Sequence, residues 1–91
     1  MKRPIATIRV TPHFARQYKH LSPEVKEMAE AREQIFRADA FDPRLRTHKL
    51  SGRLEGLWAF SVTYELRVIF EFLGADEVLF HSIGPHQVVY E

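Results

Sequence analysis

Two histidines, one arginine and one tyrosine are the residues of this sequence whose types could do chemistry together: His48, Arg67, His86 and Tyr90. An imidazole exchanges protons near neutral pH, because its unperturbed pKa is about 6.5. A guanidinium carries a permanent charge and forked donors that fit phosphate oxygens, and an aromatic ring can stack on a base. Such a set suits attack on a phosphodiester, in which one group removes a proton, one stabilises the phosphate and one returns a proton.

Other kinds of site fit the sequence poorly. There is no cysteine, no glycine-rich phosphate loop and no G-x-S-x-G, so a thiolate nucleophile is excluded and a serine nucleophile of that type is not indicated. His48 and His86 lack the short spacing of a metal-binding pair and have no carboxylate to complete a set. We therefore expect no metal and no other cofactor. His13 and His20 are interpreted as surface residues, and His81 as a satisfied histidine of a strand.

Arg67 has a plain structural alternative. It begins the strand-like run RVIFEF and is the one lysine or arginine after Glu55. An ion pair with Glu65, or with a carboxylate on a neighbouring strand, would account for it without any role in binding.

The charge of the chain is unevenly distributed although its net value is only +1. The segment RLRTHKLSGRL (residues 44–54) holds four cations and a histidine but no acid. A segment of this kind can hold a polyanion, and Arg46, Lys49 and Arg53 are the candidates for contact with such a substrate. The same charge pattern is also typical of a solvated surface loop, and charge alone does not separate the two interpretations.

Two successive helices are expected upstream of this segment. Thr11-Pro12 and Ser22-Pro23 each place a capping hydroxyl before a proline, which is the signature of a helix start. The second helix is expected to end near Ala38. Its predicted apolar stripe consists of Val25, Met28, Ile35 and Phe36, with Arg32 among them.

Four segments are expected as strands: residues 5–10, 57–64, 67–72 and 77–84. The gaps between the last three suit hairpins, the first of them with a two-residue turn at Glu65-Leu66. Residues 39–55 are expected as a loop with one extended piece at 48–50. The order strand–helix–helix–three strands predicts one α+β domain over residues 1–91, a mostly antiparallel four-stranded sheet packed against a two-helix hairpin.

No apolar run is long enough to span a membrane. The N-terminal MKRPIATIRV begins like a signal peptide, but Pro4, Thr7 and Arg9 interrupt its apolar stretch. We expect a cytoplasmic protein with no membrane partner.

Two stretches carry a resemblance to a known family: HKLSGRLEGLWAFSVTYELRVIFEF (48–72) and VLFHSIGPHQVVY (78–90). They resemble the RelE superfamily of bacterial toxins, the ribosome-associated messenger-RNA endonucleases of type II toxin–antitoxin systems, and look most like the YafQ-type branch. The sequence departs from that branch at Ser61, where another histidine is common, and at Pro85. The resemblance implies the following roles: His48 as general base, His86 as general acid, Arg67 as the group that steadies the phosphate, Glu65 as an orienting or proton-transfer group, and Tyr90 as the ring that positions substrate.

The partners implied by this resemblance are a cognate antitoxin, the ribosome and messenger RNA, with operator DNA bound only through the toxin–antitoxin complex. Two alternatives stay open: a ParE-type inhibitor of DNA gyrase, which shares the fold, and a catalytically degenerate module that only binds its antitoxin. His48, His86 and Tyr90 favour the endonuclease, because a gyrase inhibitor needs no acid–base pair.

Overall fold

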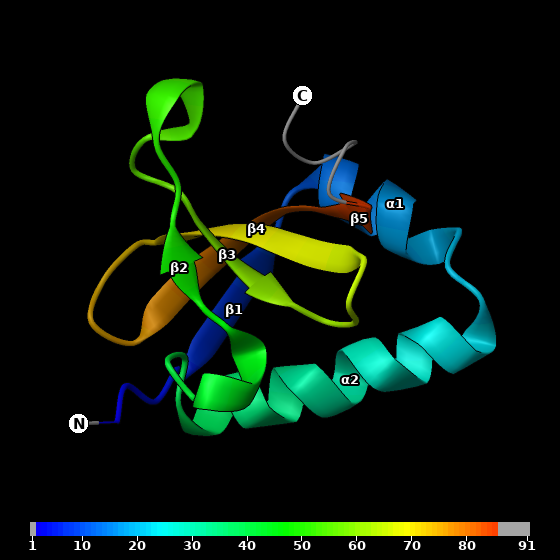
Figure 1. Cartoon of the computed structure of the whole chain (residues 1–91), viewed down its shortest axis with the longest axis horizontal. Helices are drawn as coiled ribbons and strands as arrows, with labels where there is room; N and C mark the ends of the chain where they lie inside the picture. Colours follow the sequence, from blue (N-terminus) through cyan, green and yellow to red (C-terminus); the bar gives the residue numbers. More distant parts are fainter. Residues whose placement is uncertain (1, 86–91) are drawn as a thin grey trace.

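The computed structural model describes residues 2–85, which form a five-stranded sheet and two helices (Figure 1). The elements in chain order are β1 (Thr7–Val10), α1 (Pro12–Lys19), α2 (Pro23–Ala38), β2 (His48–Lys49), β3 (Trp58–Ser61), β4 (Leu66–Phe72) and β5 (Glu77–Pro85). Two 3-10 turns, η1 (Pro43–Leu45) and η2 (Gly52–Leu54), flank β2. The predicted α+β class and order of elements are confirmed.

The predicted number of strands is wrong by one. The sheet order is β1-β5-β4-β3-β2, with β1 parallel to β5 and every other pair antiparallel. The additional strand is β2, in which His48 pairs with Ala59 and Lys49 with Trp58. Two residues cannot display the alternation that marks a strand in sequence, so this segment was expected only as an extended piece of a loop.

Both predicted helix starts are confirmed. The hydroxyl of Thr11 accepts a hydrogen bond from the Phe14 amide at 3.0 Å and donates one to the carbonyl of His81 at 2.8 Å. The hydroxyl of Ser22 accepts from the Val25 amide at 3.2 Å. Thr11 therefore caps α1 and also ties its first turn to β5.

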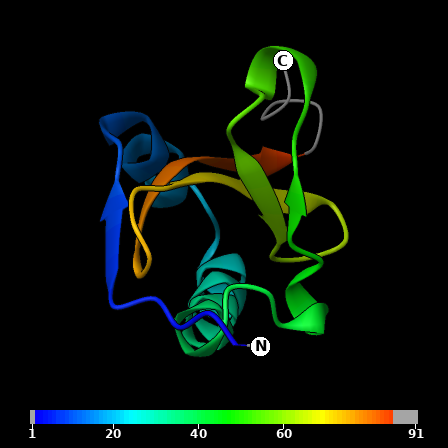
Figure 2. The same cartoon turned by 90° about the vertical axis from the view of Figure 1, so that its left-hand side faces the viewer.

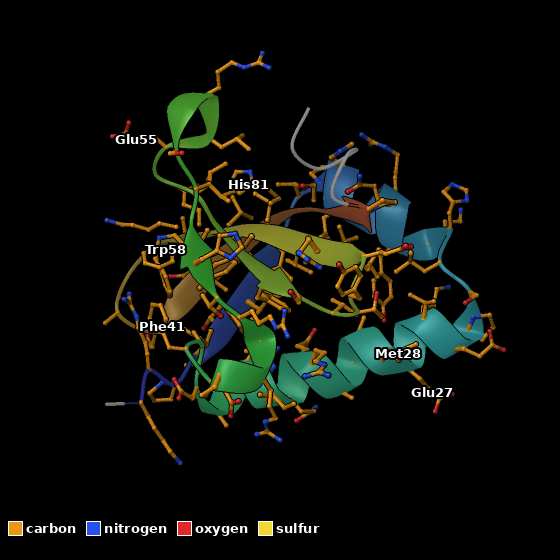
Figure 3. The ribbon with its side chains drawn as sticks, in the orientation of Figure 1. Glu27, Met28, Phe41, Glu55, Trp58 and His81 are labelled. Atoms are coloured by element: carbon orange, nitrogen blue, oxygen red, sulfur yellow. The ribbon has the colours of Figure 1, made fainter. Side chains whose placement is uncertain are left out.

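The expected apolar stripe of α2 is partly wrong. Met28 is 44% exposed, and the buried residues of the helix are Ala29 and Phe36. Figure 3 shows Met28 beside Glu27 on α2. Because successive positions on a helix are separated by about 100°, a shift of one residue in the assumed stripe exchanges an exposed residue for a buried one.

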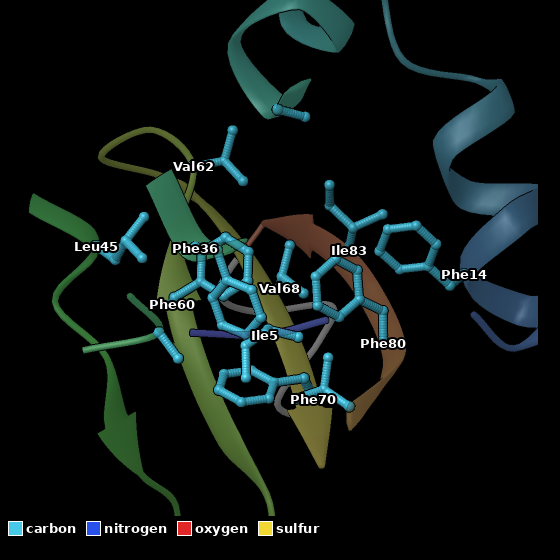
Figure 4. Packing of buried hydrophobic residues seen from close by; sticks show 13 residues of the cluster. Ile5, Phe14, Phe36, Leu45, Phe60, Val62, Val68, Phe70, Phe80 and Ile83 are labelled. Atoms are coloured by element: carbon cyan, nitrogen blue, oxygen red, sulfur yellow. The ribbon is translucent and has the colours of Figure 1, made fainter. Parts of the chain in front are cut away.

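The core is a phenylalanine cluster between α2 and the sheet (Figure 4). The ring of Phe36 is fully buried, with centroids 4.8 Å from Phe60, 5.0 Å from Phe70 and 5.5 Å from Phe80. Figures 1 and 2 show α2 lying across the sheet and α1 beside β5. Phe14 of α1 extends the cluster, 5.4 Å from Phe80.

The connection between β3 and β4 is longer than predicted, since β3 ends at Ser61 and residues 62–65 form the turn. The hydroxyl of Thr63 accepts a hydrogen bond from the Leu66 amide at 3.1 Å, and the Val62 amide donates to the Leu66 carbonyl at 2.8 Å. A two-residue hairpin needs residues that adopt positive φ, which Glu65 and Leu66 do not favour. A side-chain-supported turn replaces it and sets the position where β4 begins.

Candidate functional site

The sheet has two chemically different faces. On β4, Val68, Phe70 and Phe72 belong to the core cluster beneath α2, so Arg67, Ile69 and Glu71 must point to the opposite side. We call the first side the helix-covered face and the second the open face. Paired residues of neighbouring strands share a face, and the register therefore assigns these residues to the open face: His48, Ala59, Ser61, Arg67, Ile69, Glu71 and Ser82.

The middle of the open face has a small apolar floor. Ala59 and Ile69 are buried there and pack with Leu50 and Leu57. Figures 1 and 2 both show the loop between β2 and β3 projecting away from α2, which places it over this side of the sheet. The open face is therefore bounded below by this apolar cluster and on one side by the β2–β3 loop.

Arg67 is held at the end of β4 nearest the β3–β4 turn. Its Nη1 donates hydrogen bonds to the carbonyls of Thr63 at 3.0 Å and Tyr64 at 2.6 Å. The alternative ion pair with Glu65 is not formed: within residues 2–85, Arg67 has no salt bridge to any carboxylate. The turn therefore fixes the guanidinium in place without neutralising its charge, as a group that receives a phosphate requires.

His48 lies exposed on β2, on the same face as Arg67. Its Nδ1 is 3.0 Å from the carbonyl oxygen of Arg46. Because a carbonyl oxygen only accepts, this contact places the proton on Nδ1 and leaves Nε2 with a free lone pair in the neutral ring. That tautomer is the one a general base needs.

The other basic candidates lie in different places. Lys49 points toward the helix-covered side, because it pairs with Trp58, and its Nζ lies 5.8 Å from the Trp58 ring. Arg53 is exposed in η2, within the projecting loop. Arg46 is exposed after η1 and lines the same pocket as Arg67. Of the three predicted substrate-binding cations, only Arg46 is brought together with Arg67.

Glu65 is exposed in the β3–β4 turn, and no hydrogen bond or ion pair of its side chain occurs within the described part of the chain. His86 and Tyr90 lie outside the described residues. The last described residue, Pro85, pairs with Leu66, the neighbour of Arg67. The roles assigned to Glu65, His86 and Tyr90 stay predictions.

A histidine–carboxylate pair on the open face was missed from the sequence. Nε2 of His81 lies 3.0 Å from Oε1 of Glu71, and the register of β4 and β5 shifts between Ile69 and Phe70. Since Ile69 pairs with Ser82 and Phe70 with Phe80, His81 is the extra residue of a β-bulge, a feature that re-aims a side chain. Figure 3 marks His81 on β5. The expectation that His81 is satisfied is right, but strict alternation gave no sign of the bulge.

The helix-covered side carries an apolar groove of about 450 Å³ between α1, α2 and the sheet. It is lined by Val10, Phe14, Ala15, Tyr18, Ala29, Glu30, Glu33, Phe60, Val62, Val68, Phe80 and Ile83. The pKa of the Tyr18 phenol is raised, first by burial and then by the carboxylates of Glu30 and Glu33. The groove is thus apolar at its base and negative at its rim.

Within residues 2–85, no group of three or more His, Asp or Glu side chains is arranged to hold a metal ion. Neither described helix is long and apolar enough to cross a membrane.

Comparison with protein-family models and with curated proteins found no match. Solved structures do match. The YoeB/ParE toxin from Agrobacterium tumefaciens has a TM-score of 0.75 at 14% identity, covering 89% of this chain and 99% of that one. The toxin–antitoxin complex RelBE2 from Mycobacterium tuberculosis has a TM-score of 0.75 at 16% identity, covering 93% and 95%. YafQ from E. coli has a TM-score of 0.70 at 15% identity, covering 92% and 97%.

These toxins share one fold with this chain over nearly its whole length. The predicted RelE/ParE-type architecture is confirmed at the level of the fold.

Proposed function

We propose that this protein is the toxin of a type II toxin–antitoxin pair and cleaves messenger RNA on the ribosome without a metal ion. The observation that carries the proposal is the placement of His48 and Arg67 on one open face. Among the described residues, the Nε2 of His48 has no hydrogen-bond partner, and the guanidinium of Arg67 is fixed by the turn without an ion pair. The toxin fold and the resemblance of residues 48–72 and 78–90 to the RelE superfamily support the same conclusion. The protein acts in the cytoplasm, where its substrate is.

In the proposed reaction the RNA supplies its own nucleophile. His48 removes the proton of a 2′-hydroxyl, and the 2′-oxygen attacks the adjacent phosphorus. Arg67 stabilises the charge of the pentacoordinate phosphate. The bond from phosphorus to the 5′-oxygen breaks as His86 donates a proton to that oxygen, which leaves a 2′,3′-cyclic phosphate and a free 5′-hydroxyl. Tyr90 stacks on a base and Glu65 orients a histidine, as the resemblance implies.

The test is to mix the purified protein with ribosomes translating a defined message and to map the RNA ends. Cuts at A-site codons that leave 2′,3′-cyclic phosphate are expected, and His48→Ala, Arg67→Gln and His86→Ala should each lose them. His13→Ala is the matched control, because His13 is exposed on α1. An intact message would contradict the proposal and favour gyrase inhibition or a degenerate antitoxin-binding module.

We also propose that the antitoxin docks in the groove beside α1 and α2. Glu30 and Glu33 at the rim favour a segment whose apolar residues are flanked by Lys or Arg, and operator DNA is then bound by the complex and not by this chain alone. Val10, which lines the groove and is 48% exposed, offers the test. Val10→Asp should abolish co-purification with the co-expressed antitoxin. Leu73→Asp, at a residue 45% exposed outside the groove, should not.

A further inference from the structure

A second pocket, of about 240 Å³, lies where α2, the segment around η1 and the β3–β4 turn meet. It is lined by Arg32, Arg44, Arg46, Ser61, Val62, Thr63, Tyr64 and Arg67. Among the described residues that line it, four of eight are arginines and none is acidic. The sequence indicated Arg46 and Arg67 as candidate site residues, but not Arg32 or Arg44.

Backbone carbonyls hold two of the four guanidinium groups, those of Arg32 and Arg67. Nη1 of Arg32 donates to the carbonyl of Arg44 at 3.3 Å, a bond that links α2 to η1. Arg67 is fixed by the two carbonyls of the β3–β4 turn. A guanidinium has five N–H donors, so each of these arginines keeps donors that can reach a ligand.

The positive charge of the pocket is only partly compensated. Arg44 forms a two-point ion pair with Asp42, with Nη2 2.8 Å from Oδ2 and Nε 3.0 Å from Oδ1. Arg32, Arg46 and Arg67 have no ion pair within the described part of the chain. Three unneutralised guanidinium groups facing one small hollow attract an anion, and their planar forks fit phosphate oxygens.

The rim of the pocket also carries an aromatic ring. Tyr64 is 86% exposed, the largest exposed fraction among the exposed large apolar and aromatic residues described. A ring so open to solvent contributes little to the core, yet it stands beside a cationic hollow that also presents the hydroxyls of Ser61 and Thr63. Proteins commonly bind single-stranded RNA with arginines that contact a phosphate and a neighbouring aromatic ring that stacks on a base.

We propose that this pocket holds a phosphodiester of single-stranded RNA next to the one that is cut, with the adjoining base stacked on Tyr64. The inference rests on the proposed function, because Arg67 both lines the pocket and belongs to the open face, and so joins the two sites along one strand. Arg32, Arg44 and Arg46 hold the neighbouring phosphate. The pocket then sets the register of the message on the open face.

The test measures binding of a 2′-O-methyl RNA oligonucleotide, which lacks the attacking hydroxyl and cannot be cut. Arg32→Gln combined with Arg44→Gln should weaken binding at least about tenfold and reduce the slope of log affinity against log salt by about one. Tyr64→Ala should weaken it about 5- to 100-fold, while Tyr64→Phe binds normally. Arg16→Gln, on the exposed surface of α1, is the control and should change neither quantity.

Unchanged affinity and salt slope in the double variant would overturn the inference. If the double variant fails to fold, Arg32→Gln alone decides by the same criterion, since Arg32 touches η1 through one carbonyl. If inorganic phosphate displaces the oligonucleotide at a concentration equal to that of the oligonucleotide's own phosphates, the pocket binds a free anion and the RNA assignment is overturned. Pocket-dependent binding without any cleavage of messages would support the pocket as a site for single-stranded RNA and remove the proposed function. Cleavage with normal binding by the double variant would support the proposed function and overturn the inference about the pocket.

Discussion

The two faces of β4 carry opposite kinds of side chain within one seven-residue strand. Toward the helices, Val68 and Phe70 are at most 2% exposed and pack in the phenylalanine core. Toward the open face, Arg67 and Glu71 stay half-buried and hold polar contacts, the first to the turn and the second to His81. The same backbone thus separates the residues that stabilise the fold from those available for chemistry. Substitutions on the helix-covered face should act mainly on stability, and substitutions on the open face mainly on activity.

The largest expected effect is on the helix-covered face. Phe36→Ala removes the ring that contacts Phe60, Phe70 and Phe80 and leaves a cavity beneath the sheet. The free energy of unfolding should fall by about 3–5 kcal/mol, a large part of the stability of a small domain. Urea denaturation measures it. Met28→Ala on the same helix, at a residue 44% exposed, should change it by less than about 0.5 kcal/mol; equal losses would mean that the assigned burial of α2 is wrong.

On the open face the expected effect is on activity. Arg67→Gln keeps a polar side chain but removes the charge, and cleavage of messages should fall about 10²- to 10³-fold. The free energy of unfolding should fall by only about 1 kcal/mol, because the lost hydrogen bonds go to two partly exposed carbonyls. Cleavage kinetics and urea denaturation, measured on the same preparation, check the expected losses of activity and of stability. If Arg67→Gln lowers the free energy of unfolding as much as Phe36→Ala does, the two faces do not carry separate roles.

The sequence predicted what depends on neighbouring residues. Thr11 and Ser22 cap the helices that they were expected to cap, and the strand-like runs at residues 67–72 and 77–84 form strands as expected, because these signals act over a few residues. Features that depend on pairing between strands distant in sequence could not be predicted from neighbouring residues. The strand at His48 exists only because β3 pairs with it, and the bulge at His81 appears only when β4 and β5 are aligned.

The arginine pocket illustrates the same limit within the candidate site. Arg32 stands on α2 and was expected as part of an apolar stripe, whereas Arg44 and Arg67 come from η1 and β4. Nothing in their sequence spacing joins them. Charge counting found the basic segment around Arg46 but not the helix residue that completes the pocket, because only the packing of α2 and η1 brings the two together.

The β3–β4 turn connects the two faces, so a change there should have a moderate effect on both. Thr63→Val removes the hydroxyl that accepts from the Leu66 amide, and the free energy of unfolding should fall by about 0.5–1.5 kcal/mol. Because the Thr63 carbonyl also positions Arg67, cleavage should fall by a smaller factor than in Arg67→Gln. Thr63→Ser keeps the hydroxyl and is the matched control. A loss of stability with cleavage fully retained would show that the turn does not position Arg67.

The smallest expected effect concerns Asp42, the carboxylate that partly neutralises the arginine pocket. Hydrogen bonds from the Arg44 side chain and amide, together with the charge of Arg44, lower the pKa of Asp42 from 3.8 to about 2. Because the folded-state pKa lies below the unfolded one, the contribution of this pair to stability is present above the unfolded value and is lost as pH falls through 3.8 toward 2.

Arg44→Gln should therefore raise the pKa of Asp42 toward its ordinary value, as an NMR titration of its side-chain carboxyl carbon would show, whereas Arg16→Gln should leave it unchanged. Between pH 5 and 8 Asp42 stays fully ionised in either case, so its titration should not alter oligonucleotide binding over that range. A midpoint for Asp42 that does not respond to Arg44→Gln would mean that Arg44 is free of the carboxylate. The pocket would then carry four unneutralised arginines instead of three, and its affinity for RNA should depend still more steeply on salt.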